Sequence, residues 1–122
     1  MSTRRPVDEV PDGPAIEDLA RLDLRVGRIL EAAPLPGART PSYRMRIDLG
    51  AEGERSSSAR ITSCYPDPST LVGRLVVAVV NLPPRRVAGF ESQVLVLGAL
   101  GDGDVVRLLG VDRGAEPGQR IA

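Results

Sequence analysis

Histidine and lysine are absent from the 122-residue chain, so all sixteen cationic side chains are arginine. Without histidine the chain lacks the usual general base at neutral pH and the commonest metal ligand, and without lysine it lacks the amine that forms Schiff bases. An enzyme would have to work with Asp, Glu, Ser, Tyr and Arg alone. We therefore expect a binding protein rather than an enzyme, with no metal ion and no cofactor.

Cysteine occurs once, as Cys64, and tryptophan does not occur. A single cysteine cannot form an internal disulfide, and without a histidine partner it is expected to be a passive thiol. No segment approaches the roughly 18 apolar residues of a membrane span, and residues 1–15 lack the apolar core of a signal peptide. These features predict a cytoplasmic protein without membrane insertion, with a flexible tail over residues 1–15 and one domain over residues 16–122.

Aromatic residues are also few, because only Tyr43, Tyr65 and Phe90 are present to stack on bases. This counts against a protein that binds single-stranded nucleic acid by stacking on its bases.

The net charge is zero, yet residues 25–86 carry ten arginines against five acidic residues. This middle segment forms either a basic face or part of a mixed, soluble surface, and charge alone does not decide between them.

Strand patterns dominate the sequence. Residues 16–22 have the apolar spacing of one short amphipathic helix, and residues 65–73 are expected to form a turn or a single helical turn. The clearest alternation lies in residues 43–49, where apolar and charged side chains take turns, and Gly27 is expected to mark a bulge or tight bend. Strands are expected over residues 24–30, 43–49, 56–62, 74–80, 93–97 and 105–109.

This pattern fits an all-β fold, an OB-type five-stranded Greek-key barrel with a short N-terminal helix and a C-terminal extension. An SH3-like barrel or an open sandwich would show much the same periodicity.

Asp102 and Asp104 lie in a Gly-Asp-Gly-Asp segment. This segment favours a hairpin turn over a calcium loop, because the later ligands of an EF-hand are missing.

Residues 81–92 are the strongest candidate for a binding site. Asn81 and the pair Arg85-Arg86 flank Pro83-Pro84, and the two prolines exclude helix and stiffen the connection between two apolar strands. A loop held by two strands presents its donors in fixed positions. Ser92, at the start of the next strand, is either a turn hydroxyl or a further donor.

Arginines on neighbouring strands form a second candidate surface. Arg44 and Arg46 alternate on one strand face, where the simple interpretation is a solvated face with cross-strand ion pairs. With Arg25, Arg28 and Arg60 they would instead line a cationic groove, since guanidinium binds phosphate or carboxylate in two places at once.

Several motifs resemble one family in the right order: residues 23–29, residues 43–50, Leu71-Val72-Gly73 and residues 81–92. The chain is similar to the tRNA-binding OB domains appended to methionyl- and phenylalanyl-tRNA synthetases, and more closely to the CsaA-like secretion chaperones. Gln93-Val94 stands where the synthetase domains usually have Gly-Met, as it does in CsaA-like members. The loop 33–43 lacks the His and Lys of many tRNA-binding relatives.

The resemblance implies a homodimeric chaperone that binds unfolded preproteins or extended peptides near residues 81–92. A tRNA or single-stranded nucleic acid is the alternative ligand. The residues that we expect to contact the ligand are Asn81, Arg85, Arg86, Phe90, Ser92, Ser57, Ser58, Arg60, Arg44 and Arg46.

Overall fold

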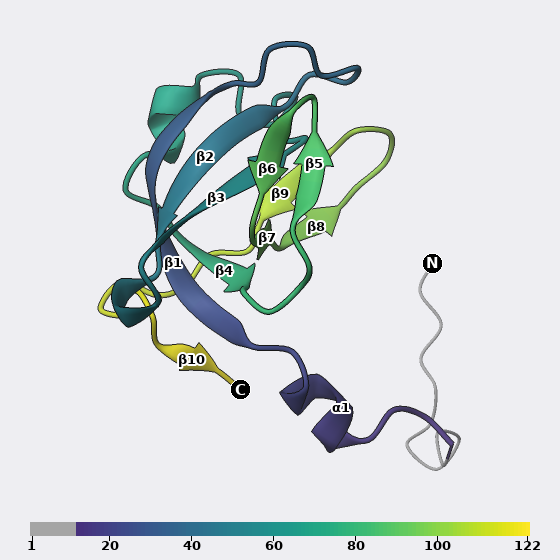
Figure 1. Ribbon diagram of the computed structural model, residues 1–122, viewed down its shortest axis with the longest axis vertical. Helices are drawn as coiled ribbons and strands as arrows, with labels where there is room; N and C mark the ends of the chain where they lie inside the picture. The colour runs from purple at the N-terminus through teal and green to yellow at the C-terminus, as the bar shows by residue number, and fades with distance from the viewer. Residues whose placement is uncertain (1–11) are drawn as a thin grey trace.

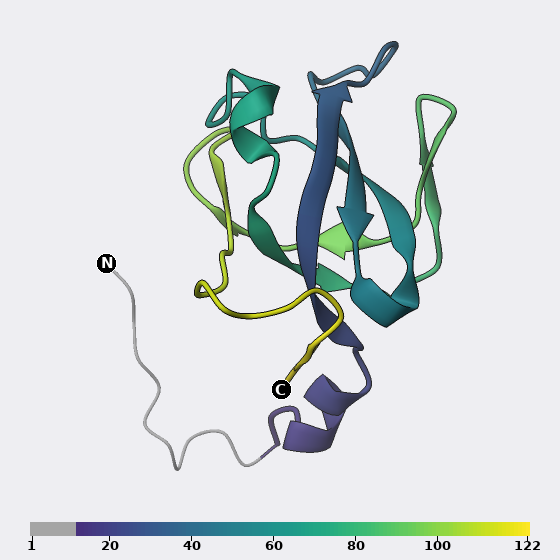
Figure 2. The same ribbon diagram turned by 90° about the vertical axis from the view of Figure 1, so that its left-hand side faces the viewer.

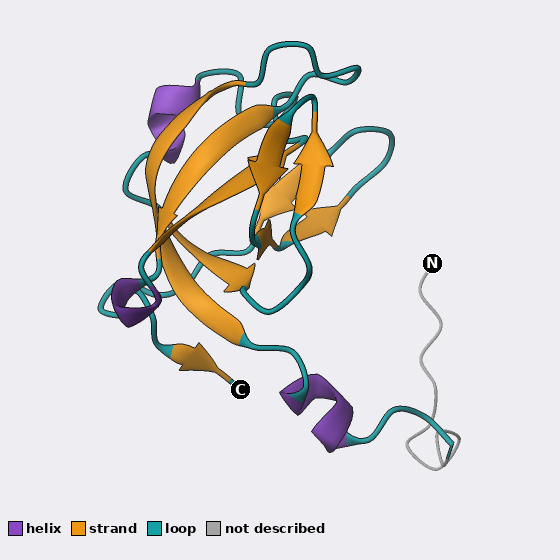
Figure 3. Cartoon of the chain, in the orientation of Figure 1, coloured by secondary structure: helices purple, strands orange, loops and turns teal. Residues whose placement is uncertain are grey.

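The structure is a computed structural model that describes residues 12–122, so most of the predicted N-terminal tail lies outside the described residues (Figures 1 and 3). Strands are the main regular structure of the described chain, which also has one short α-helix and two 3-10 turns. The elements are α1 (Ile16–Ala20), β1 (Leu24–Pro34), β2 (Tyr43–Asp48), η2 (Gly50–Glu52), β3 (Glu54–Ala59), η3 (Pro68–Leu71), β4 (Leu75–Val79), β5 (Arg85–Val87), β6 (Phe90–Ser92), β7 (Leu95–Val96), β8 (Gly98–Leu100), β9 (Val106–Leu108) and β10 (Arg120–Ile121).

Five strands form a nearly closed barrel in the order β3-β2-β1-β4-β7, and all neighbours pair antiparallel. The two ends of this sheet meet where the N–H groups of Gln93 and Val94 donate to the Ser56 carbonyl oxygen at 2.9 and 3.1 Å. The view in Figure 2 shows the curved sheet with β5 and β6 standing out from it. This strand order and closure are those of the OB fold, so the predicted fold class is confirmed.

The alternation in β2 places the core on one side of the barrel wall. Tyr43, Met45 and Ile47 are buried, whereas Arg44 and Arg46 are exposed. Because side chains of a strand point alternately to opposite faces, a period of two in the sequence becomes an apolar inside and a charged outside. The remaining core comes from β1, β4 and the connectors, with Ile29, Leu49, Ile61, Leu71, Val76, Ala78 and Val94 buried.

Gly27 was expected to mark a bulge or tight bend, and the bulge does not lie there. The register of β1 against β2 shifts between Ile29 and Glu31, so the bulge lies farther along the strand. Gly27 is instead a point of close approach, because a Cβ atom there would lie 2.5 Å from Ile47 Cγ2. The barrel packs its core against the bare backbone of β1 at this position.

The last thirteen residues are more ordered than the sequence indicates. They were expected to trail off from the barrel, but β10 pairs with the start of β1, with Leu24 opposite Ile121. The predicted strand over residues 93–97 is shorter in the structure, where only Leu95–Val96 forms β7. The segment 101–105 is the predicted hairpin turn, in which Gly101 N–H donates to the Val105 carbonyl oxygen at 2.8 Å.

Helix α1 lies outside the barrel, near β10, in both ribbon views (Figures 1 and 2). Its apolar residues Ile16 and Leu19 are 76% and 44% exposed. Within residues 12–122, no helix is both long and apolar enough to cross a membrane.

Candidate binding groove

The predicted binding loop is a β-hairpin. β5 and β6 pair through Arg85 opposite Ser92 and Val87 opposite Phe90. Ala88 and Gly89 at the tip have φ values of 51° and 80°, the left-handed conformations that a tight two-residue hairpin turn requires. The hairpin, following Pro83-Pro84, is therefore a stiff projection beside the barrel (Figure 1).

Asn81 does not face a ligand. Its side-chain oxygen accepts a hydrogen bond from Asp23 N–H at 2.9 Å, and its Nδ2 group donates to the Arg21 carbonyl oxygen at 2.8 Å. Both functions of the amide are thus used to hold the segment between α1 and β1. Asp23 is fixed further by Arg25, whose hydrogen bond and positive charge hold the pKa of the Asp23 carboxyl below its usual value.

Two of the predicted serines, Ser57 and Ser92, use their hydroxyls to close the barrel, and Ser58 takes part through its backbone N–H. Ser57 is fully buried and donates to the Val94 carbonyl oxygen at 2.9 Å. The Ser92 hydroxyl is buried and accepts a hydrogen bond from Ser58 N–H at 2.9 Å. We call this contact between β3 and residues 91–94 the seam, because side chains complete a junction that a regular strand ladder does not.

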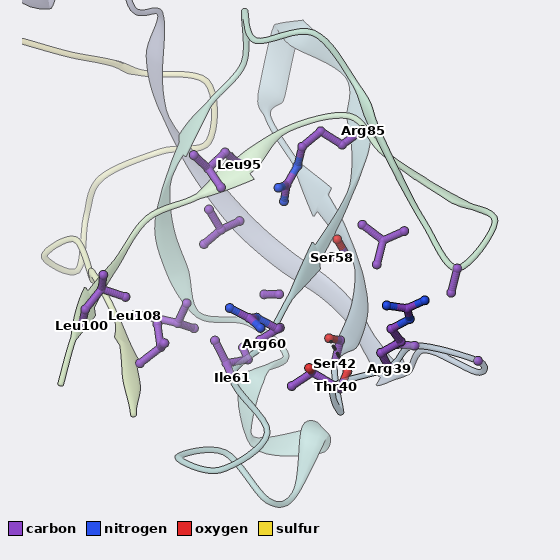
Figure 4. Close-up of a pocket in the computed structure, with 17 residues that line it drawn as sticks. Arg39, Thr40, Ser42, Ser58, Arg60, Ile61, Arg85, Leu95, Leu100 and Leu108 are labelled. Carbon is purple, nitrogen blue, oxygen red and sulfur yellow. Dashed lines mark hydrogen bonds between the residues drawn. The ribbon is translucent and has the colours of Figure 1, made fainter. Parts of the chain in front are cut away.

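Residues of β3 and β7 both line an open hollow of about 660 Å³, which we call the groove. Its walls come from β3 and β7, both hairpins and the loop before β2. In Figure 4, Leu95, Leu100 and Leu108 lie on one side, Arg85 and Arg39 on the other, and Arg60 between them. Leu100 is 85% exposed, which is unusual for a large apolar side chain.

The groove is cationic as well as apolar. Arg39, Arg60 and Arg85 line it, and no acidic residue does. Among residues 12–122, these three guanidinium groups have no hydrogen-bond or ion-pair partner. Uncompensated arginines beside an apolar wall suit a ligand that combines apolar groups with carboxylate, carbonyl or phosphate oxygens.

Two of the predicted residues, Arg60 and Arg85, are thus brought together, and Ser58 lies beside them. The sequence did not predict Arg39 or the three leucines on one side of the groove, Leu95, Leu100 and Leu108, which we call the leucine wall. Arg39 lies in the proline-containing loop before β2, and Leu100 ends β8 next to the Gly101 turn, so their positions in and beside loops were a signal. Nothing in the sequence relates these two loops to each other.

A second hollow, of about 570 Å³, lies over β1, β2 and β3 and contains other predicted residues. Phe90, Arg44 and Arg46 line it. Arg46 is paired with Glu31 and Glu54, at 3.0 Å in each case, which leaves less charge for a ligand. Arg86 lines neither hollow and donates to the Gly89 carbonyl oxygen at 2.9 Å within its own hairpin.

The five-arginine track considered for nucleic acid is therefore dispersed. Arg60 lines the groove, and Arg44 and Arg46 line the second hollow. Arg25 binds Asp23 and the Gly118 carbonyl oxygen, and Arg28 donates to the Gly73 carbonyl oxygen at 2.9 Å. The expected stacking surface is reduced too, since Tyr43 is in the core, leaving Phe90 half-exposed and Tyr65 beneath Arg74.

Comparison with known proteins identifies the family. Residues 24–120 match the family described as "Putative tRNA binding domain". The chain belongs to this tRNA-binding domain family. The match covers the whole barrel, both hairpins and the pairing of Arg120 with β1, so the groove lies within the family domain.

Two solved structures of family relatives have the same fold over nearly their whole length. The crystal structure of chaperone CsaA from Bacillus anthracis str. Ames is 44% identical, with a TM-score of 0.84, covering 89% of this chain and 98% of that one. The CsaA chaperone protein from Picrophilus torridus is 41% identical, with a TM-score of 0.81, covering 89% and 99%. The resemblance expected from the motifs is confirmed.

Among curated proteins, the methionine–tRNA ligase of Nitrosomonas eutropha is 41% identical over 118 residues, which is 97% of this chain. The chain spans only 16% of that ligase. The similarity therefore concerns a domain of the ligase.

Proposed function

We propose that the protein is a CsaA-like chaperone, which binds unfolded preproteins as extended segments in the groove. The observation that carries the proposal is the exposed leucine wall, with Leu100 85% exposed, next to three arginines that no acidic lining residue neutralises. The two CsaA structures, which are 44% and 41% identical and are covered over 98% and 99% of their length, are described as chaperones. We further propose that residues 16–122 form one domain.

The chemistry of the groove suits an unfolded chain. Such a chain exposes apolar side chains and unpaired backbone groups, and each leucine-sized side chain that is buried contributes about 1.5–3 kcal/mol. The arginines offer hydrogen-bond donors for carbonyl and carboxylate oxygens. Because these contacts specify no particular sequence, the groove is suited to many clients, and the binding itself needs no cofactor or catalysis.

A tRNA is the second candidate ligand, and the family match favours it. Arg39, Arg60 and Arg85 would contact phosphates, and Phe90 with Arg44 would extend the surface around the hairpin. If the three groove arginines each neutralise one phosphate, the plot of log K against log salt falls with a slope of about −2 to −3. Binding of an uncharged unfolded client has a nearly flat slope.

The test compares variants inside and outside the groove. Arg60→Gln with Arg85→Gln removes two groove cations, and Arg44→Gln removes an exposed cation of the second hollow. We expect the double variant to lose most of its affinity for a denatured preprotein, measured by fluorescence anisotropy, and Arg44→Gln to bind like the wild type. Equal affinity of all three proteins contradicts the proposal. Tight tRNA binding without client binding supports the second candidate.

We propose a homodimer that buries the apolar surface of α1. Ile16, Leu19 and Leu22 are exposed in the described chain, as is Leu82 near Asn81. A second copy would cover these side chains and gain their burial energy. Ile16→Glu with Leu19→Glu should then give a monomer in light scattering, whereas Leu100→Glu should remain a dimer. A cytoplasmic location stays a prediction from the sequence.

A further inference from the structure

The two strands that border the groove have open edges. On β3, the N–H groups of Ser56 and Ser58 point to the seam, where they donate to Gln93 Oε1 and Ser92 Oγ. Backbone groups of alternate residues in a strand point to the same side. The Ser58 carbonyl and the Arg60 N–H therefore point toward the groove, past the end of the seam.

The edge of β7 follows from its pairing with β4. Leu97 N–H donates to the Val77 carbonyl oxygen at 2.9 Å, and Leu95 is the next residue that faces β4 in the same register. Val96, between them, turns its N–H and carbonyl away from β4 and toward β3. Among residues 12–122, none of these four backbone groups on Ser58, Arg60 and Val96 has a hydrogen-bond partner.

These groups border one space, because Ser58, Arg60 and Val96 all line the groove. The chain of antiparallel pairings from β3 to β7 makes the two strands parallel to each other. A segment that pairs with either edge therefore has the same orientation relative to both edges. An exposed edge with unpaired donors and acceptors is a template for a further strand.

The positive charge of the groove indicates which kind of polypeptide segment it would bind. Arg39, Arg60 and Arg85 surround the open edges without any acidic lining residue, so acidic side chains on the bound segment have partners and cationic ones are repelled. Resting on the proposed function, we propose that the groove binds an extended, acidic polypeptide segment as an added strand on the open edges of β3 and β7. The main chain supplies the binding, and carboxylates of the client pair with the arginines.

The first experiment uses an octapeptide in which Val and Glu alternate. Replacing the two central amide bonds by esters removes two N–H donors with little change in shape, and the same replacement at the two ends is the matched control. We expect the central esters to weaken binding about tenfold, since each lost hydrogen bond is worth a few-fold, and the terminal esters to change it less than about twofold. Replacing Glu by Gln should also weaken binding, by about threefold to tenfold.

The second experiment removes the donor from the protein. Arg60→Ala deletes the guanidinium and keeps the N–H, whereas Arg60→Pro deletes both, at an edge position where proline costs no internal hydrogen bond. We expect Arg60→Pro to bind the octapeptide at least threefold more weakly than Arg60→Ala. If Arg60→Pro does not fold, the ester series alone decides.

Equal affinity of the amide and central-ester peptides overturns strand addition, and equal affinity of the Glu and Gln peptides overturns the acidic preference. In both cases, the chaperone proposal still holds if the unmodified protein binds a denatured preprotein. If neither the octapeptide nor the denatured preprotein binds, the proposed function and this inference fail together. Displacement of the octapeptide by oligouridylate, with no ester effect, also overturns strand addition.

Discussion

Replacing Asn81 with alanine separates a structural role from a binding role. The amide of Asn81 makes two hydrogen bonds, at 2.9 Å from Asp23 N–H and at 2.8 Å to the Arg21 carbonyl oxygen. Each is worth about 0.5–1.5 kcal/mol net, and the site is exposed, so water offsets part of the loss. We expect Asn81→Ala to reduce the free energy of unfolding by about 1–2 kcal/mol.

Urea unfolding at a fixed protein concentration measures this change. With an m value of about 2 kcal/mol/M, the loss lowers the midpoint by about 0.5–1 M. Arg85→Ala is the matched variant, because Arg85 lines the groove and makes no hydrogen bond or ion pair within residues 12–122. Its stability should lie within about 0.5 kcal/mol of the wild type, as for most surface substitutions.

Client affinity should show the opposite pattern, unchanged in Asn81→Ala and weakened in Arg85→Ala. The reasoning is refuted if Asn81→Ala unfolds at the wild-type urea midpoint and loses client affinity. Asn81 would then be a ligand donor, and its two internal hydrogen bonds would contribute nothing measurable.

Three further substitutions test the barrel. Gly27→Ala places a Cβ atom 2.5 Å from Ile47 Cγ2, so we expect the free energy of unfolding, measured with denaturant, to fall by about 1–3 kcal/mol. A wild-type unfolding midpoint would contradict the close packing. Ser57→Ala removes a buried hydroxyl that donates across the seam, which should cost about 1–2 kcal/mol in the same assay, and no loss would mean that the seam closes without it. Arg25 lowers the pKa of the Asp23 carboxyl, so at acidic pH the unfolded state binds more protons than the folded state, and stability falls as the pH drops through the folded-state pKa. Asp23→Asn removes this titration and should flatten the plot of unfolding free energy against pH between about 5 and 2. An unchanged slope would exclude the Asp23–Arg25 pair as its source.

The barrel was predictable because local patterns determine it. The alternation in residues 43–49 appears in the sequence as a period of two and in the structure as buried and exposed side chains. The β5–β6 hairpin was not predicted, since Ala88-Gly89 at its tip lacks the Asn-Gly signature of such turns. The strand β10 has only two residues, which is too short for any periodicity to appear.

The site was harder to predict because it depends on contacts between distant segments. Asn81 resembled a free donor in the sequence, but its partners lie 58 and 60 residues earlier in the chain. Ser57 and Ser92 likewise reach their partners, Val94 and Ser58, only when the barrel closes. Arg60 and Arg85 were identified by residue type alone, whereas Arg39 and Leu100 join them through loops that no local pattern connects.

The most direct measurement of the central claim is an amide shift map of the isotope-labelled protein titrated with a denatured preprotein. If the groove is the binding site, the largest shifts occur at residues of the groove, with Arg60, Val96 and Leu100 among them, and residues around Arg44 change little. Shifts concentrated around Phe90 and Arg44, or around α1, would contradict the account.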